Sequence, residues 1–285
     1  TNNLLALCHV AQSRPPSPEG TTTALRVLVA LCASPSPANP GRYLDLLDRM
    51  IERARDPGVD REVHVRALLA RATLLRHSGQ TARGVEDVEA ARVLLPEPAE
   101  GPLAARVHAA LGFAYTEIAR LVDARAALER AKWLLDCDDD PWLRALVSFR
   151  WYFLADRGGA PKDALRWCRE ALDLFRRIGD GFWQGQCHAS LADVLRDAGR
   201  LAEAQDHLAR ARDLLGGHTI PLFEAQNLCR EGLLLQEQGR YDEACDRMAR
   251  AVVVDRHGGE RFFEGVHLAR LASVELEMGA FAEAY

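Results

Sequence analysis

The sequence predicts an all-α protein, an α-solenoid in which antiparallel helix pairs stack into a right-handed superhelix. Three observations predict this fold. The composition is 48% hydrophobic and 27% charged with only 7% aromatic residues, which is typical of helical proteins rich in Ala, Leu, Arg and Glu. Small residues recur along the chain with a period of 40, and glycine recurs between the two helices of each repeat.

Three series of small residues define the repeat register. Antiparallel helices with axes about 8–10 Å apart need small side chains where they cross, so we expect these positions to face each other. In the first series, only Tyr152 interrupts the pattern. The first helices carry Ala72, Gly112, Ala192, Gly232 and Ala272; the second helices open on Gly84, Ala124, Ala164, Ala204, Ala244 and Ala284; and the third series is Ala91, Ala131, Ala171, Ala211 and Ala251.

The turn inside each repeat carries glycine in five of six copies, where a left-handed residue ends the first helix. Ala119 is the exception. The copy with Tyr152 and Gly158-Gly159 departs most from the pattern, and we expect any irregularity of the superhelix there. The turn glycines are Gly79, Gly159, Gly199, Gly239 and Gly279.

Residues 1–60 predict degenerate N-terminal helices that form a capping repeat. Residues 3–12 resemble a short helix, which the proline-rich segment 14–18 breaks. Thr21–Thr23 can cap a second helix that runs to about Cys32, and an amphipathic helix at 43–55 follows the proline-rich loop 34–41. Terminal repeats commonly deviate in this way.

Residues 61–285 predict the regular array. One helix pair cannot bury its apolar face alone, so neighbouring pairs must stack into a continuous core. Because the chain begins without Met and stops inside a repeat, we expect it to be an excerpt of a longer polypeptide. The units lie near 65–104, 105–144, 145–184, 185–224, 225–264 and 265–285, the last one truncated.

The repeats resemble the tetratricopeptide (TPR) family. The resemblance rests on the small-residue spacing and on the turns Gly199-Arg200-Leu201 and Gly239-Arg240-Tyr241, each followed closely by Glu-Ala. The family consensus is about 34 residues, and the excess here lies between the second helix and the next unit. A period of 40 is also near that of HEAT repeats, but the turn and the small residues favour the tetratricopeptide type.

The long unit and links such as residues 177–181 (RIGDG) are similar to the C-terminal helical arrays of bacterial signalling ATPases, including LuxR-type ATP-dependent transcription regulators. This resemblance implies a scaffold in a larger bacterial regulatory protein, binding a peptide, a partner protein or a neighbouring domain in its concave groove. The alternative is a domain that senses a peptide or small molecule and controls a signalling ATPase or transcription regulator.

Composition narrows the partners and the compartment. A net charge of −5 without a basic patch predicts no direct binding to nucleic acid. No stretch of 18 apolar residues occurs, so no membrane span is expected. Seven cysteines without a CxxC pair are typical of reduced thiols, which predicts a cytoplasmic protein.

Common catalytic signatures are missing from the sequence. The patterns GxxxxGK[ST], GxGxxG, HExxH and GxSxG do not occur, which predicts neither an enzyme nor a cofactor. Cys187-His188 could be a nucleophile and its base, but adjacent helical residues point about 100° apart, which favours packing.

No metal site is predicted. Cys8-His9, His64 with His77, and His257 with His267 lack the spacing that puts two ligands on one helical face. The acidic run 136–140 could bind Ca²⁺, but an N-cap at Asp140 before Pro141 explains it more simply.

Aromatic residues recur at equivalent helix starts. They could stack on bases. Their period of 40 favours instead a role in sealing one unit against the next. These residues are Trp142, Phe182-Trp183, Phe223 and Phe262-Phe263.

The concave groove is the predicted functional surface, lined by the first helices. Three phenylalanines could form an apolar anchor pocket and three arginines could bind carboxylates; the alternative is that the phenylalanines are core and the arginines a solvated face. The predicted groove residues are Arg66, Arg76, Arg106, Phe113, Phe149, Phe153, Gln186, Asp193, Arg196, Gln226 and Gln236.

Overall fold

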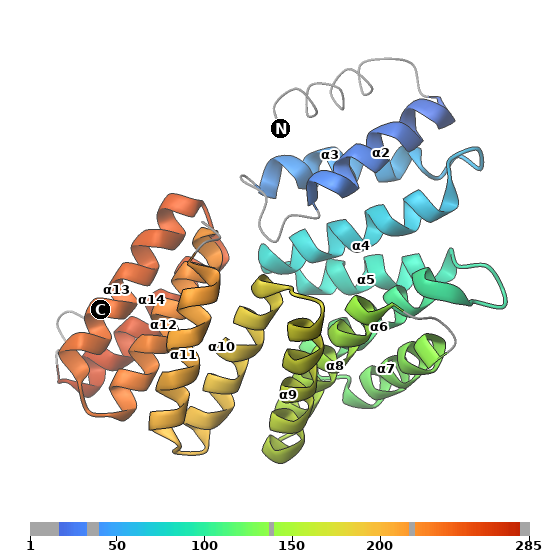
Figure 1. The fold of residues 1–285 in the computed structure, drawn as a ribbon. Helices are drawn as coiled ribbons and strands as arrows, with labels where there is room; N and C mark the ends of the chain where they lie inside the picture. Colours follow the sequence, from blue (N-terminus) through green and yellow to red (C-terminus); the bar gives the residue numbers. More distant parts are fainter. Residues whose placement is uncertain (1–16, 33–39, 137–139, 217–219, 280–285) are drawn as a thin grey trace. The chain divides into compact units, whose positions relative to one another are not determined.

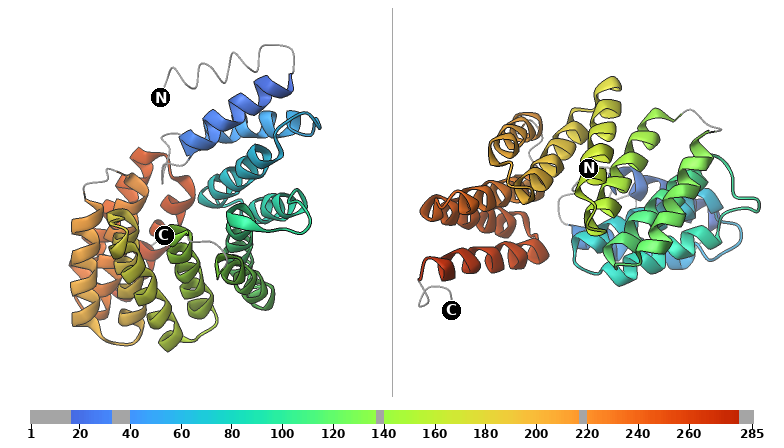
Figure 2. Two further views of the ribbon diagram at one scale, coloured as in Figure 1. Left: turned by 45° about the vertical axis from the view of Figure 1, so that its right-hand side comes forward. Right: turned by 90° about the horizontal axis from the view of Figure 1, so that it is seen from below.

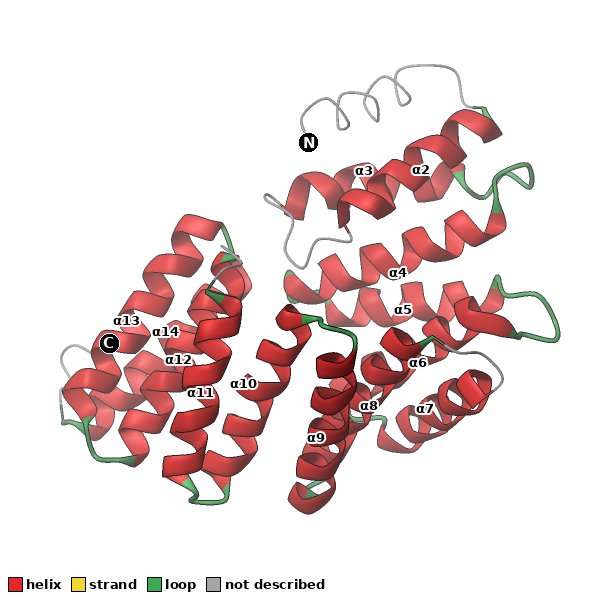
Figure 3. Ribbon diagram, viewed as in Figure 1, coloured by secondary structure: helices red, strands yellow, loops and turns green. Residues whose placement is uncertain are grey.

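Helices make up every regular element in the described parts of the computed structural model, which cover residues 17–32, 40–136, 140–216 and 220–279 (Figures 1 and 3). They pair as antiparallel neighbours, as two further views show (Figure 2). The chain divides into two compact units, residues 1–140 and 141–285. The all-α, tetratricopeptide-like prediction is therefore confirmed.

Each unit contains helix pairs. Unit 1 comprises α2 (Pro18–Cys32), α3 (Pro40–Arg53), α4 (Arg61–His77), α5 (Thr81–Val93), α6 (Gly101–Glu117) and α7 (Leu121–Asp136). Unit 2 comprises α8 (Pro141–Arg157), α9 (Pro161–Arg177), α10 (Gly181–Asp197), α11 (Leu201–Leu215), α12 (Pro221–Glu237), α13 (Tyr241–Gly258) and α14 (Arg261–Glu277).

The start of α2 differs from the prediction that Thr21–Thr23 cap it. The helix begins at Pro18, and the backbone N–H of Gly20 donates to Ser17 Oγ at 3.2 Å. Thr21 lies inside the helix and is buried. Proline tolerates the first helical turn, where its missing donor costs nothing. The predicted helix at 3–12 lies outside the described residues.

Small residues do face each other where paired helices cross. A Cβ on Gly112 would lie 2.5 Å from Leu128 Cδ2 and 3.3 Å from the carbonyl oxygen of Ala124. A Cβ on Gly232 would lie 2.8 Å from Met248 Cγ. Contacts this short leave no room for another methyl group, so the small-residue series sets the spacing within each pair.

Tyr152 fits the helix crossing because its neighbours are small. It is 4% exposed and packs in a core with Ala164 and Cys168, while its ring stacks on Phe149 with centroids 5.5 Å apart. Both helices of this copy are 17 residues long, as α6 and α10 are. The larger ring thus replaces the close crossing with an aromatic core.

The repeat turns use the left-handed conformation that the glycines predict. Gly199 has φ of 72°, and the other turn glycines have similar values. Ala119 adopts φ of 60° at the same place. A side chain in this region costs about 1 kcal/mol or more, so the repeat geometry overrides the local preference of Ala119.

Most of the recurring aromatic residues seal adjacent helix pairs, as predicted. Trp142 and Trp183 meet edge to face at 6.1 Å, and Phe182 meets Phe223 at 5.1 Å. Phe262 is different, because it is 45% exposed. The sealing prediction is therefore wrong for Phe262, which lies at the start of the last described helix.

Cys187 and His188 do not form a nucleophile–base pair. His188 Nδ1 lies 2.8 Å from Nδ1 of His207 on α11. On the other side of the ring, His188 Nε2 lies 3.5 Å from Arg176 Nη2. Cys187 is fully buried, and its carbonyl oxygen accepts from the Cys168 thiol at 3.3 Å. Both residues pack inside the pair, which confirms the packing interpretation.

The two histidines are held in the neutral form. Burial, His207 and nearby arginines lower the pKa of His188 to about 4. Burial and Arg210 also lower the pKa of His207. A neutral pair can share one hydrogen between the facing nitrogens, whereas two imidazolium rings would repel each other.

The left-handed turn predicts reciprocal changes in stability. Ala119→Gly should raise the free energy of unfolding by about 1 kcal/mol, because it removes the Cβ from a left-handed residue. Gly199→Ala should lower it by a similar amount. Thermal unfolding followed by circular dichroism measures both, and a destabilised Ala119→Gly variant would contradict the account.

The histidine pair predicts an acid-labile contribution to stability. The folded-state pKa of His188 lies below the unfolded value of about 6.5. The contribution of the neutral pair to the free energy of unfolding is therefore complete above pH 6.5 and decreases as the pH falls towards 4. His188→Gln should remove up to about 3 kcal/mol of this pH dependence. Denaturant unfolding at several pH values measures it. The exposed His257→Gln is the control, and an unchanged acid dependence in His188→Gln would refute the assignment.

Candidate interaction surface

The first helices of unit 2 carry a row of polar side chains that interact from one repeat to the next. Arg230 on α12 bonds Asp193 on α10, and Gln236 on α12 bonds Glu277 on α14. The negative charge of Asp193 raises the pKa of Asp156 on α8, so the two carboxylates influence each other. These links join first helices to first helices only, so the residues share one face. We call this face the first-helix row; it comprises Asp156, Asp193, Asp197, Arg230, Gln236 and Glu277.

An ion pair lies at the centre of the first-helix row. Arg230 Nε donates to Asp193 Oδ2 at 2.9 Å, and the two side chains are 22% and 29% exposed. Burial opposes the charge on Arg230, but Asp193 outweighs it and the pKa of Arg230 is raised. Asn227 Oδ1 lies 3.5 Å from Arg230 Nη1. The guanidinium is thus held across α10 and α12.

Asp156 is a carboxylate under repulsion. Burial raises its pKa first, and the charges of Asp193 and Asp197 raise it further, while Arg157 partly offsets them. Within the described parts of the chain, the exposed side chain of Asp156 has no hydrogen-bond or ion-pair partner. A positive group placed beside it would relieve this repulsion.

The structure places the predicted groove residues in both units. In unit 1, Arg66 is exposed, and Arg76, Arg106 and Phe113 are half-buried. In unit 2, six residues are half-buried on the first helices: Phe153, Gln186, Asp193, Arg196, Gln226 and Gln236.

The position of Phe149 contradicts the prediction that it forms part of an apolar anchor pocket in the groove. It is 3% exposed and lies in the aromatic core, 5.1 Å from the ring of Phe153 and 5.6 Å from that of Trp183. The core alternative is therefore right for Phe149, because α8 turns this ring towards neighbouring aromatic residues. Phe153 keeps part of its ring exposed. Phe113 belongs to unit 1.

The three predicted arginines in unit 1 already face acidic partners of their own unit. Arg66 lies 2.6 Å from Glu62 on the same helix. Arg76 and Arg106 lie 4.0 Å from Glu117 and Asp140, respectively. Arg76 also lies 5.3 Å over the ring of Phe113. An incoming carboxylate would have to compete with these contacts.

The groove residues predicted from the repeat register do not include four residues of the first-helix row: Asp156, Asp197, Arg230 and Glu277. A signal existed for three of them. Asp156 lies 40 residues before Arg196, a predicted groove residue, and Asp197 and Glu277 occupy the next register position. Arg230 had no such signal, because its role depends on Asp193 in the preceding repeat.

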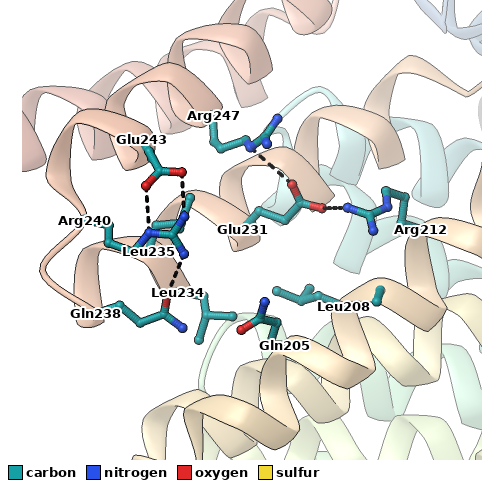
Figure 4. A pocket seen from close by; sticks show the side chains of 11 residues that line it. Gln205, Leu208, Arg212, Glu231, Leu234, Leu235, Gln238, Arg240, Glu243 and Arg247 are labelled. Atoms are coloured by element: carbon teal, nitrogen blue, oxygen red, sulfur yellow. Dashed lines mark hydrogen bonds and ion pairs between the residues drawn. The ribbon is translucent and has the colours of Figure 1, made fainter.

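A cavity of about 200 Å³ lies between α11, α12 and α13, away from the predicted groove residues (Figure 4). Glu231 lies at its centre, 3.0 Å from Arg212 and 3.6 Å from Arg247. Arg240 pairs with Glu243 at its rim. Figure 4 shows these charges paired with one another, so the cavity offers no free carboxylate or guanidinium.

Residues with the chemistry of a metal ligand do not gather in the described parts: no group of three or more His, Cys, Asp or Glu side chains is placed to hold an ion. Cys137, Asp138 and Asp139 of the acidic run lie outside the described residues. Among the described helices, none is both long and apolar enough to cross a bilayer.

The family comparison agrees with the helix geometry. Residues 157–215 match a tetratricopeptide repeat model. No curated protein matches the sequence significantly.

Solved structures resemble the fold over nearly the whole chain. NprR in complex with its cognate peptide NprX is 12% identical, with a TM-score of 0.74, and the match covers 99% of this chain and 83% of that one. A Rap protein complexed with competence and sporulation factor is 14% identical, with a TM-score of 0.70, covering 94% and 74%.

A third similar structure is a Signal Transduction ATPase with Numerous Domains, with a tetratricopeptide repeat sensor, from Pyrococcus horikoshii. It is 14% identical with a TM-score of 0.61, and the match covers 92% of this chain and 44% of that protein. Identities this low establish the fold alone. Together with the repeat match at residues 157–215, they show a helical repeat fold like that of tetratricopeptide repeat proteins.

Proposed function

We propose that the chain is a non-catalytic interaction module that binds an extended peptide segment of a partner along the first-helix row of unit 2. The observation that carries the proposal is Asp156, an exposed carboxylate whose pKa the charges of Asp193 and Asp197 raise and whose side chain forms no ion pair within the described residues. Repulsion among neighbouring carboxylates costs free energy that a cationic partner would relieve.

The row favours a basic side chain in the bound peptide. A lysine or arginine beside Asp156 would relieve the repulsion from Asp193 and Asp197. Phe153 lies three residues before Asp156 on α8, so both side chains share a helix face. An aromatic ring next to a carboxylate suits a cation, because the ring face attracts positive charge.

Amide side chains supply contacts for a peptide backbone. Among the described residues, no acceptor is placed for the buried Nε2 of Gln186. Gln226 and Gln236 are half-buried on α12. An extended peptide presents carbonyl oxygens at regular intervals and can satisfy such donors.

The similar structures support a peptide as the bound group. NprR was solved with its cognate peptide and a Rap protein with competence and sporulation factor. Both resemble this chain over more than nine-tenths of its length. The likeness supports the helical repeat fold as a peptide-binding module. The charges of the first-helix row support a basic side chain in the bound peptide.

The same proposal places the module in the cytoplasm, as the helical repeat region of a larger regulatory protein. The cysteines support a reducing compartment, because within the described residues no disulfide forms at Cys32, Cys168, Cys187, Cys229 or Cys245. The Pyrococcus horikoshii protein with a repeat sensor supports the proposal of a larger regulatory protein, since the match covers 44% of that longer chain.

A second candidate is a sensor whose ligand is a small molecule and which controls a signalling ATPase or a transcription regulator. The similarity to a repeat sensor favours it. A thermal-shift screen separates the two candidates, because a small molecule that binds the folded chain raises its melting temperature.

Selection from a library of random-sequence peptides tests the proposal. The purified chain should enrich peptides that contain Lys or Arg. Asp156→Asn together with Asp193→Asn should weaken binding of the selected peptides about tenfold, or about 1.4 kcal/mol, because the attraction for the basic side chain is removed. Fluorescence anisotropy measures the affinity.

Asp173→Asn is the matched control. It removes a carboxylate from the exposed surface of α9, outside the first-helix row. It should leave the affinity unchanged. Selection of peptides without basic residues, or an equal loss in the control, would contradict the proposal.

A further inference from the structure

Three charged side chains meet at the cavity between α11, α12 and α13: Arg212 on α11, Glu231 on α12 and Arg247 on α13. Arg212 Nη1 donates to Glu231 Oε1 at 3.0 Å, and Arg247 Nε lies 3.6 Å from Glu231 Oε2. Figure 4 shows Glu231 between the two guanidinium groups. We call these three residues the Glu231 trio.

The repeat register shows that the fold does not require this trio. One repeat before Arg212 and Glu231 stand Leu172 and Leu191, which are both buried in a hydrophobic core. One repeat after Glu231 stands Leu271, which also packs against a hydrophobic core. The Glu231 side chain is only 17% exposed. Because well-packed apolar residues are often at least as stabilising as a buried ion pair, the charges need another explanation than stability.

The charges that line the cavity do not balance. Two arginines face the single carboxylate of Glu231, which leaves one positive charge of the trio uncompensated. The pair at the rim is complete in itself, since Arg240 donates to both carboxylate oxygens of Glu243, at 2.7 and 2.6 Å. The lining therefore carries three arginines against two glutamates. A ligand with one negative charge would neutralise it.

Both arginines of the trio keep hydrogen-bond donors for a second acceptor. A guanidinium has five N–H donors in one plane. Among the described residues, Arg212 directs one of its donors at a side chain, and Arg247 lies beyond hydrogen-bond distance from Glu231. The two side chains are 62% and 36% exposed, so a ligand can reach them from solvent. A carboxylate is the planar acceptor that matches such donors.

The remaining lining suits a small apolar group. Leu208, Leu234 and Leu235 line the cavity together with Ala209. The cavity volume is about 200 Å³. An engineered apolar cavity of about 150 Å³ holds benzene, so this one has room for a single ring or a short alkyl chain beside one carboxylate group.

We propose that this cavity binds a small organic monocarboxylate, whose carboxylate group lies between Arg212 and Arg247 and whose apolar part lies against the leucines. The anion neutralises the lining and accepts from donors that Glu231 leaves unused. The cavity shares no residue with the first-helix row, so the site does not depend on what the row binds.

The bound carboxylate would join two repeats. Arg212 lies on the second helix of one repeat, and Arg247 lies on the second helix of the next. A ligand held by both arginines therefore favours the stacked arrangement of these two repeats over any arrangement that separates the guanidinium groups.

Titration of the intact chain with benzoate and with hexanoate, at constant ionic strength, tests the proposal. Isotopically labelled methyl groups of Leu208, Leu234 and Leu235 report binding, because these side chains line the cavity. Their NMR signals should shift with dissociation constants of about 1 mM or lower. Benzamide and hexanamide, which lack the charge, should bind at least about tenfold more weakly. Inorganic phosphate, which lacks the apolar part, should also bind at least about tenfold more weakly.

Substitutions in the trio should change the affinity for benzoate in opposite directions. Arg212→Gln and Arg247→Gln should each weaken binding about tenfold, because one guanidinium group is lost. Glu231→Gln should strengthen binding at least about threefold, since it removes the competing carboxylate and keeps the size of the side chain.

Arg200→Gln is the matched control. It removes the same charge one repeat before Arg240, where Arg200 pairs with Glu203 outside the cavity lining, and it should leave the affinity unchanged. The comparison of benzoate with benzamide uses the unaltered chain, so it does not depend on how the variants fold. Absence of benzoate binding, equal binding of benzoate and benzamide, phosphate binding as tight as benzoate binding, or an equal loss in Arg200→Gln would each overturn the proposal.

Discussion

The close crossing of paired helices is the constraint on which the rest of the structure depends. At Gly112 and Gly232 the partner helix approaches so closely that a single added methyl group would collide with Leu128 or Met248. The spacing within a pair follows from these contacts, and the left-handed turn follows from the need to reverse the chain at once. Stacking then buries the apolar faces that each pair leaves open.

The same register makes departures from it informative. Positions that recur every 40 residues show what the fold needs, so a residue that breaks the series points to another role. Tyr152 replaces a small residue and packs in an aromatic core, stacked on Phe149. Asp156 adds an unpaired carboxylate to the surface of the first helices, and His267 places an ionisable ring where a preceding repeat has Asn227. The proposed peptide-binding function rests on one such departure, Asp156.

The sequence was sufficient for the fold because helix crossings and turns depend on residues close together in the repeat. It was less informative for the surface. Phe149 occupies a groove position of the register, yet it packs in the core against the Trp183 ring of α10. Arg230 and the His188–His207 contact escaped prediction because each depends on a partner in another helix. The start of α2 differed because the Ser17 hydroxyl, not a threonine at 21–23, accepts a hydrogen bond from the first turn.

A double-mutant cycle between Gly112 and Leu128 tests the central claim most directly. Gly112→Ala and Leu128→Ala should each lower the free energy of unfolding, the first by collision and the second by loss of burial. The account predicts that the double variant is about 1 kcal/mol or more better than the sum, because removing the leucine side chain makes room for the methyl group. Additivity within about 0.5 kcal/mol would show that the two positions do not set the helix spacing.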